Sequence, residues 1–470
     1  MKHPLIIQGG MGAGVSLWKL PRAVSLMGQL GVVSGTGVEF IFARQLQLGD
    51  PEGHLRRALK HFPAPAIAER VFNTYFVENG IPKKQPFKSP HRFAINPDQG
   101  LVEITIVANF CIMWLAKEGH NGAIGINLLE KIQLPHLFVL YGALLAGVDY
   151  VLVGAGIPTQ FPRILDHLTQ HEPASYKVHV VGAKPTDNFK VNFNPKSILG
   201  NPVATLKRPY LLPIISSTLL AKILMKAGRI NGFVIEGPTA GGHNAPPRGH
   251  TKISSTSELV YGKKDEVDLA VIKSAGLPYW LAGSFNTPEK LDEARNLGAQ
   301  GIQAGSIFAL CEESGLDPIQ KQTARRLGFR NALQIYTNSS ASPTGFPFKE
   351  AVLPGSLTDP DVYQNRPRIC DVGELRGIFL QENGELGYCC PAEPLGPYLS
   401  KGGKIGDTER RICLCNALLA NIGLAQRRSN NTVEPPFVTL GSNLSFLPNL
   451  MDDENSWYTA KQAIDYLLST

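Results

Sequence analysis

The stretch YWLAGSFNTPEKLDEARNLGAQGIQAGSIFAL, residues 279–310, predicts a strand, a helix and a second strand in direct succession. Both apolar runs end in the dipeptide Gly-Ser, and between them Leu291, Ala294 and Leu297 recur at the spacing of one helix face. A proline near the start of that segment and a glycine near its end are typical helix boundaries. Because a helix carries the chain back along the sheet, we expect the two strands to be parallel.

The same alternation of apolar runs and amphipathic segments recurs along the chain up to about residue 330. The candidate strands lie at 4–10, 31–37, 102–110, 122–129, 149–156, 177–183, 210–217, 232–238, 279–285 and 301–308. Residues 217–228 form a second convincing helix, with serine or threonine at its start and glycine at its end. Ten candidates exceed the eight strands of a closed barrel, so we expect two to be accessory. The prediction is an α/β fold, a TIM (β/α)8 barrel with additions.

The alternation of predicted strands and helices is interrupted in three places. We expect residues 1–330 to form the barrel, with a proline-rich insertion at about 50–100 and another insertion at 184–209. From residue 331 the alternation stops, and most of the cysteines follow. We therefore expect residues 331–470 to form a C-terminal extension packed on the barrel.

Composition and charge argue against several classes of function. The 46 Lys and Arg residues exceed the 39 Asp and Glu residues, giving a net charge of +7, but they form no block that would bind nucleic acid. No uninterrupted apolar stretch reaches the roughly 18 to 20 residues of a membrane helix. The N-terminus MKHPLIIQGG lacks the apolar core of a secretory signal. We expect a cytoplasmic protein without nucleic-acid or membrane partners.

Glycines gather where the candidate strands end. In parallel α/β folds the ligand lies at this end, because the loops and helix N-termini meet there. The neighbouring loops with Gly283, Ser284, Gly305 and Ser306 predict a phosphate site, since backbone N–H groups at helix starts attract anions. Tight turns alone would also explain any one of these glycines. No G-x-G-x-x-G motif opens a βαβ unit, so the expected cofactor is a mononucleotide, most simply FMN.

The chain resembles the nitronate monooxygenase family, which also contains flavin-dependent enoyl-ACP reductases. The resemblance covers about residues 4–330, through IIQGGMGAGVS, GAIGINLLEKIQ, VLVGAGIP, IISSTLLAKIL, VIEGPTAGGHN, YWLAGSFNTPEKL and GIQAGSIFAL in the order of the family. It implies a TIM barrel that holds FMN at the C-terminal ends of its strands. Each motif is weak alone, and their shared order is specific.

The resemblance also implies roles for individual residues. The isoalloxazine would contact Gly10, Met11 and Gly12, and Asn127 would hydrogen-bond to the flavin ring. Gly241 and Gly242 would let the backbone approach the cofactor, and Gly154 would line the flavin or substrate pocket. Gly283, Ser284, Gly305 and Ser306 would hold the phosphate. Simpler explanations are core packing for Met11 and a strand-end cap for Asn127.

His243 falls on the active-site histidine of the family, which is the base that deprotonates a nitroalkane. Imidazole has an ordinary pKa near 6.5 and can accept a C–H proton at neutral pH. A histidine that only hydrogen-bonds to a loop is the alternative. Thr239 stands where family members usually have an acidic residue, and Pro246 and Pro247 stiffen the following loop. These departures put the substrate in doubt.

The extension carries five of the seven cysteines. An odd number without an export signal argues against a disulfide framework. Cys370, Cys390, Cys413 and Cys415 are the candidate ligands of zinc or an iron–sulfur cluster, because a C-x-C pair and two distant cysteines can supply four thiolates. A redox role and plain buried thiols are the alternatives.

Three functions compete. The leading one is an FMN-dependent oxidoreductase of the nitronate monooxygenase type, which oxidises nitronates or nitroalkanes with O2 and uses His243 as base. The second is an FMN-containing enoyl-thioester reductase of fatty acid or polyketide metabolism, driven by NAD(P)H. The third is a catalytically silent flavin- or metal-binding scaffold. The partners would be a small-molecule substrate and O2 or NAD(P)H, and a homo-oligomer stays open.

Overall fold

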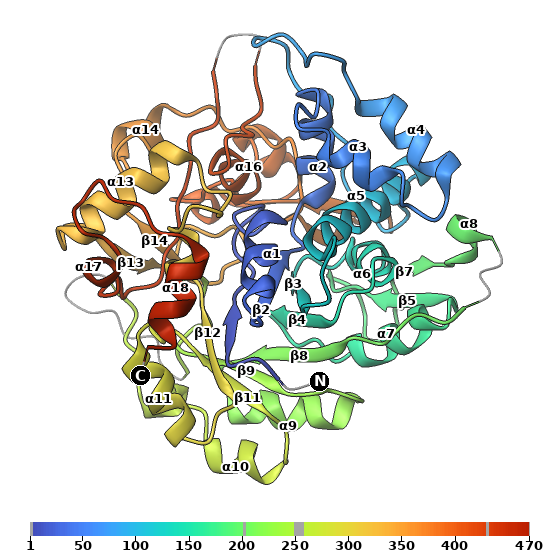
Figure 1. Cartoon of the computed structure of the whole chain (residues 1–470). Helices are drawn as coiled ribbons and strands as arrows, with labels where there is room; N and C mark the ends of the chain where they lie inside the picture. The colour runs from blue at the N-terminus through green and yellow to red at the C-terminus, as the bar shows by residue number, and fades with distance from the viewer. Residues whose placement is uncertain (1–2, 201–203, 249–257, 429–431, 470) are drawn as a thin grey trace.

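The computed structural model describes residues 3–200, 204–248, 258–428 and 432–469. At its centre is a closed barrel of parallel strands in the order β1-β12-β11-β9-β8-β4-β3-β2 (Figure 1). The strands are β1 (Ile6–Gln8), β2 (Leu30–Ser34), β3 (Ile124–Leu129), β4 (Tyr150–Gly154), β8 (Tyr210–Ile215), β9 (Phe233–Glu236), β11 (Tyr279–Ala282) and β12 (Gly301–Ala304). The predicted α/β fold and TIM barrel are confirmed.

The inside of the barrel is a separate apolar core. It contains Ile7, Leu30, Val32, Tyr150, Leu152, Leu212, Val234, Trp280 and Ala282, all buried. Side chains alternate along a strand, so the residue two positions after an inward one also points inward. At the C-terminal ends of their strands these next inward positions are held by Ser34, Gly154, Ile214 and Glu236. The packed core therefore ends in a layer that is partly polar.

Helices surround the barrel. They include α1 (Lys19–Leu26), α2 (Val38–Gln47), α6 (His136–Leu145), α7 (Phe161–Thr169), α9 (Thr218–Ala227), α10 (Leu269–Ser274), α11 (Pro288–Asn296), α12 (Ser306–Ala309) and α13 (Pro318–Phe329). The Ser217 side chain caps α9 by accepting from the Leu220 N–H at 3.0 Å. α11 has Pro288 in its first turn, and Gly298 follows it at φ +83°. Both predicted helices are confirmed.

The predicted strand at 102–110 is wrong. These residues lie in α5 (Gln99–Lys117), whose N-cap Asp98 accepts from the Leu101 N–H at 3.0 Å. α5 packs against α1, α2, α3 (His54–Leu59), α4 (Pro65–Tyr75) and α6, so burial on several sides leaves no amphipathic period to reveal the helix. It is long and apolar enough to cross a membrane, but 83% of its most apolar window is buried inside the protein. α5 is thus a core helix.

The candidate strand at 177–183 lies outside the barrel. It divides between β5 (Ala174–Lys177) and β6 (Val180–Val181). β5 pairs with β7 (Lys190–Phe193), which is followed by α8 (Lys196–Leu199). β6 joins the hairpin of β15 (Gly377–Leu380) and β16 (Leu386–Cys389) from the extension. Of the ten candidates, eight form the barrel, one is accessory and one is helical.

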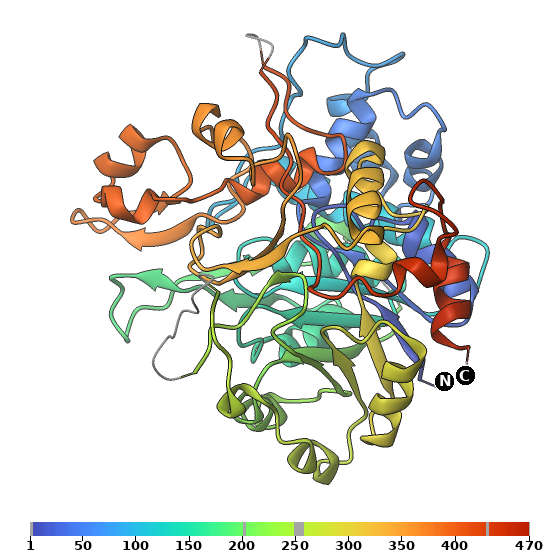
Figure 2. The same cartoon turned by 90° about the vertical axis from the view of Figure 1, so that its left-hand side faces the viewer.

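The proline-rich excursion and the extension meet each other on the barrel. The excursion folds as α3 (His54–Leu59) and α4 (Pro65–Tyr75) before an irregular stretch that leads to α5. The extension contains β13 (Ile335–Asn338), β14 (Phe348–Ala351), α14 (Pro360–Asn365), α15 (Leu395–Ser400), α16 (Leu414–Ala420), α17 (Leu447–Leu450) and α18 (Ala460–Leu467). In Figure 2 its orange part lies above the green and teal strands of the barrel.

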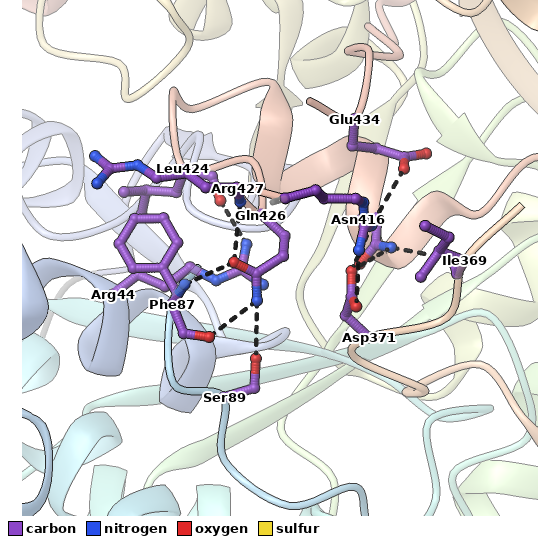
Figure 3. Close-up of polar contacts among 11 residues, drawn as sticks. Arg44, Phe87, Ser89, Ile369, Asp371, Asn416, Leu424, Gln426, Arg427 and Glu434 are labelled. Carbon is purple, nitrogen blue, oxygen red and sulfur yellow. Dashed lines mark hydrogen bonds and ion pairs between the residues drawn. The ribbon is translucent and has the colours of Figure 1, made fainter. Parts of the chain in front are cut away.

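Gln426 fastens the extension to the excursion (Figure 3). Its Oε1 accepts from the Phe87 N–H at 2.8 Å, and its Nε2 donates to the Phe87 carbonyl at 3.0 Å. Arg44 of α2 donates to the Leu424 carbonyl two residues earlier. Close by, the Asp371 carboxylate pairs with Arg428 at 2.7 Å. These buried contacts fix the segment that leads over the barrel mouth.

Candidate active site at the barrel mouth

A cavity of about 230 Å³ lies at the C-terminal ends of the strands. Every residue predicted to hold the flavin or act on the substrate lines it: Gly10, Met11, Gly12, Asn127, Gly154, Gly241, Gly242, His243, Gly283, Ser284, Gly305 and Ser306. They come from strand ends far apart in the sequence, so the fold brings them to one place. Their individual roles stay predictions.

Gly10 packs directly against Asn127. A Cβ at Gly10 would lie 2.3 Å from the Asn127 Cβ, so only glycine fits here without moving the asparagine. The Asn127 Oδ1 atom is buried and has no hydrogen-bond partner among the described residues. Two other cavity residues also have a buried amide oxygen without a hydrogen-bond partner among the described residues: Gln303, through Oε1, and Asn286, through Oδ1.

Unpaired buried polar atoms are costly unless a ligand or water satisfies them. A flat heterocycle that carries N–H and carbonyl groups, such as the flavin of FMN, suits this set of amides at the top of the barrel. The residues present therefore fit an FMN ring. Gln303 and Asn286 were not singled out from the sequence. For Gln303 the signal was a polar residue inside an apolar strand.

The loops after β11 and β12 form the part expected to bind phosphate. Gly283 has φ +93° and Ser284 has φ +59°, so two successive residues adopt the left-handed conformation. For serine this conformation is uncommon and strained. The Ser306 hydroxyl accepts a hydrogen bond from the Gly441 N–H at 2.7 Å. The extension thus closes directly over the expected phosphate loops.

His243 lies on a short strand, β10 (Gly242–His243), which pairs antiparallel with β14 of the extension. Its Nε2 hydrogen-bonds to the Ser342 hydroxyl at 2.8 Å, and its ring packs edge-on against Phe348 with centroids 4.7 Å apart. Burial lowers the pKa of His243 well below 6.5, and the positive charge of Lys131 lowers it further. The imidazole is therefore neutral at pH 7.

The extension supplies the roof of the cavity. Leu414, Leu418, Leu419, Val438 and Leu440 line it with apolar side chains, and Glu374 and Cys415 line it as well. The sequence singled out only Cys415 among them, as a metal ligand, because nothing local in the sequence indicates which part of a long extension will cross the barrel mouth. Glu236 was also missed. Its signal was one acidic residue that ends the apolar strand VIE.

The expected metal site is not supported. The described residues contain no group of three or more His, Cys, Asp or Glu side chains that could hold a metal ion. All seven cysteines are free thiols, and burial raises the pKa values of Cys390 (to about 12), Cys413 and Cys415. Cys413 and Cys415 stand two positions apart where α16 begins, a spacing that does not place two side chains on one helix face. Cys390 is buried, and Cys370, Cys413 and Cys415 are partly buried.

The family model for nitronate monooxygenase matches residues 173–341, which include β8, β9, β11, β12 and the His243 loop. Over these residues the chain is similar to the nitronate monooxygenase family. A nitronate monooxygenase of Pseudomonas aeruginosa is 26% identical over 211 residues, which are 43% of this chain and 52% of that protein. A probable nitronate monooxygenase of Bacillus subtilis is 31% identical over 110 residues, 23% of this chain and 29% of that protein. The chain therefore spans about half or less of these curated relatives.

Solved structures resemble the chain over nearly its whole length, at low identity. FabK from Thermotoga maritima has a TM-score of 0.48 and 16% identity, with 100% of this chain and 92% of that chain covered. A nitroalkane oxidase from Streptomyces ansochromogenes has a TM-score of 0.42 and 14% identity, with coverages of 99% and 94%.

Proposed function

We propose that this protein is an FMN-dependent oxidoreductase of the nitronate monooxygenase family that oxidises nitronates or nitroalkanes with O2. One observation carries the proposal: the strand-end residues expected from the family surround a single cavity, and three amide oxygens there lack hydrogen-bond partners among the described residues. FMN, when bound, supplies a two-electron acceptor that O2 can reoxidise. The substrate is a small molecule that enters beneath the apolar roof.

The residues of the chain divide the work of binding. Gly10 and Asn127 face the proposed ring site from β1 and β3, while Gly283, Ser284, Gly305 and Ser306 face the proposed phosphate site. The extension excludes water from above. A water-poor site strengthens the hydrogen bonds made to charge that develops on the substrate.

His243 is the proposed base. Its imidazole lines the cavity and is neutral, so one ring nitrogen can accept the α-proton of a nitroalkane while Ser342 holds Nε2. A nitronate has already lost this proton and needs no base. The proposal therefore separates the two substrates: His243→Asn should lose turnover of the neutral nitroalkane and retain turnover of the nitronate.

The test is a visible spectrum followed by anaerobic reduction in parallel with propionate 3-nitronate, NADPH and a crotonyl thioester. We expect flavin absorption, bleaching by the nitronate and reoxidation by O2. A colourless protein that cannot be reconstituted with FMN overturns the flavin proposal. Equal loss of nitroalkane and nitronate turnover in His243→Asn, with FMN retained, overturns the role of His243 as base.

An enoyl-thioester reductase is the second candidate, and the apolar roof favours it. The leucine-rich lining from α16 and the segment around Val438 suits an acyl chain better than a short nitroalkane. In this case NADPH would bleach the flavin rapidly, and the crotonyl thioester would reoxidise it without O2.

A further inference from the structure

Glu236, the last residue of β9, is a carboxyl group that the proposed reaction leaves unused. Val234, two positions earlier, belongs to the core inside the barrel, so the alternation of the strand also turns Glu236 inward. Glu236 lines the cavity together with His243 and Asn127. A carboxylate at the inner end of a barrel strand occupies the position from which such folds supply catalytic groups.

No described residue hydrogen-bonds to the Glu236 carboxylate, and burial raises its pKa to about 7. The charge that opposes this shift is Lys131, whose Nζ is buried without a hydrogen-bond partner among the described residues. Lys131 lies over the Phe346 ring at 4.4 Å. The same charge lowers the pKa of His243, so Lys131 acts on both titratable groups.

Other ionisable groups near this cluster are engaged elsewhere. Glu130 precedes Lys131 and accepts from the Tyr176 hydroxyl at 2.7 Å. Behind Glu236 a small hollow is lined by Arg248, Tyr261 and Asp265. The Arg248 guanidinium donates to backbone carbonyls, and Tyr261 donates to the Ala245 carbonyl. Glu236 is thus the carboxyl at this spot that stays available to the cavity.

His243 and Glu236 differ in basicity, and this difference suits them to different roles. Protonated His243 gives up its proton readily, because burial disfavours the imidazolium and the charge of Lys131, whose own pKa burial lowers well below 10.5, disfavours it further. It can remove a proton but cannot keep it at neutral pH. Ionised Glu236 holds a proton readily, since protonation cancels a buried charge.

We propose that Glu236 is a second acid–base group of this site and takes up the proton that His243 removes from the substrate carbon. The inference rests on the proposed function. The substrate C–H bond breaks, and its electron pair moves onto the nitro group. The proton binds first to the imidazole and then to the Glu236 carboxylate, which becomes a neutral acid. Release of the proton to water restores both groups, and no oxidant enters this step.

The test uses Glu236→Gln and Glu236→Asp in the holoenzyme, with Glu130→Gln as the matched control. Glu130 is also a carboxyl beside Lys131, partly buried, but it does not line the cavity. The first measurement is exchange of the nitroethane α-proton with D2O on anaerobic, pre-reduced enzyme, followed by proton NMR. The second is the pH profile of kcat with nitroethane.

We expect the wild type to gain activity as the pH rises through about 7, since only ionised Glu236 accepts a proton. Glu236→Gln should bind FMN normally and lose the gain of activity with rising pH. It should also exchange the α-proton at least tenfold more slowly. Glu236→Asp should restore part of the rise of kcat with pH and part of the exchange rate. Glu130→Gln should keep both at the level of the wild type.

Unchanged exchange and pH profile in Glu236→Gln, with an active wild type, overturn the inference and leave the proposed function standing. Loss of FMN from this variant also overturns it and makes Glu236 a cofactor-holding residue. A wild type that neither binds FMN nor exchanges the proton ends both proposals. If Glu236→Gln does not fold, Glu236→Asp decides: a profile identical to the wild type with full exchange counts against the inference.

Discussion

The Nε2 atom of His243 lies 2.8 Å from the hydroxyl of Ser342, which joins a barrel loop to the C-terminal extension. Other hydrogen bonds around the cavity also join barrel loops to the extension. The Gly242 N–H donates to Thr439 Oγ1 at 2.7 Å, and the Asn286 amide donates to the Asn443 carbonyl at 2.8 Å. The barrel thus supplies the candidate chemical groups, and the extension supplies their partners. The extension is part of the site.

Ser342→Ala should lower kcat for nitroalkanes about tenfold, or roughly 1.4 kcal/mol in activation free energy, because the His243 ring loses the group that orients it. The free energy of unfolding should fall by roughly 1 to 3 kcal/mol, because the hydroxyl also bonds to the Oγ1 and the N–H of Thr344 and each neutral hydrogen bond contributes about 1 kcal/mol net. Steady-state kinetics and a urea titration measure the two effects.

Ser356→Ala is the control for this change. Ser356 is another fully buried serine of the extension, and its hydroxyl bonds to Leu353 and Thr358, away from the cavity. It should lose similar stability and keep kcat. Equal kcat values for Ser342→Ala and the wild type would show that the hydroxyl does not orient the histidine.

Ser284→Gly separates backbone strain from phosphate binding. Glycine adopts the φ of +59° found at Ser284 at no steric cost, so stability should stay constant or rise by up to about 1 kcal/mol. If the hydroxyl contacts the FMN phosphate, FMN affinity should nevertheless fall several-fold, which quenching of flavin fluorescence measures. Ser284→Ala should lose the same affinity without any gain in stability. FMN affinities equal to the wild type in both variants contradict the phosphate role.

Gly10→Ala should displace Asn127, because the new Cβ would lie 2.3 Å from the Cβ of the asparagine. We expect FMN to bind at least tenfold more weakly, equivalent to about 1.4 kcal/mol. Gly396→Ala serves as the control, since a Cβ there meets no atom within 4 Å. An apoprotein that melts like the wild type while FMN binding is weakened would locate the effect in the site. Unaltered FMN binding would remove Gly10 from it.

The barrel and much of its mouth could be predicted because the relevant signals are local. Gly-Ser follows the strand at 301–304, and the period of two within such a strand decides which side chains face inward. The same period, counted on from Val234, places Glu236 on the inner face of its strand. The helix at 99–117 could not be predicted, because a helix that is buried on most sides has no amphipathic period. The pairing of His243 with Ser342 escaped because it joins residues 99 positions apart and depends on tertiary packing.

Glu39 of α2 and Glu374 of the extension form a buried carboxyl pair that should make the stability of the protein depend on pH. The two side chains hydrogen-bond to each other, and burial raises the pKa of Glu39 to about 7 and that of Glu374 well above 4.5. The folded state therefore holds protons that the unfolded state releases above pH 4.5. The stabilising contribution is full at low pH and is lost as the pH rises through about 7.

Glu39→Gln removes one ionisation and keeps a side chain that can hydrogen-bond to Glu374. Relative to the wild type, we expect the variant to be stabilised at pH 8 by up to about 3 kcal/mol, from 1.36 kcal/mol per pKa unit, and to be unchanged at pH 4.5. The free energy of unfolding should depend less steeply on pH in the variant than in the wild type. Some dependence should remain, because burial also raises the pKa values of Glu236 and Glu434 to about 7. Urea unfolding at both pH values measures this, with the exposed Asp465→Asn as control. A variant that is destabilised equally at both pH values would mean that the pair does not share a proton, and that the extension is held on α2 by packing alone.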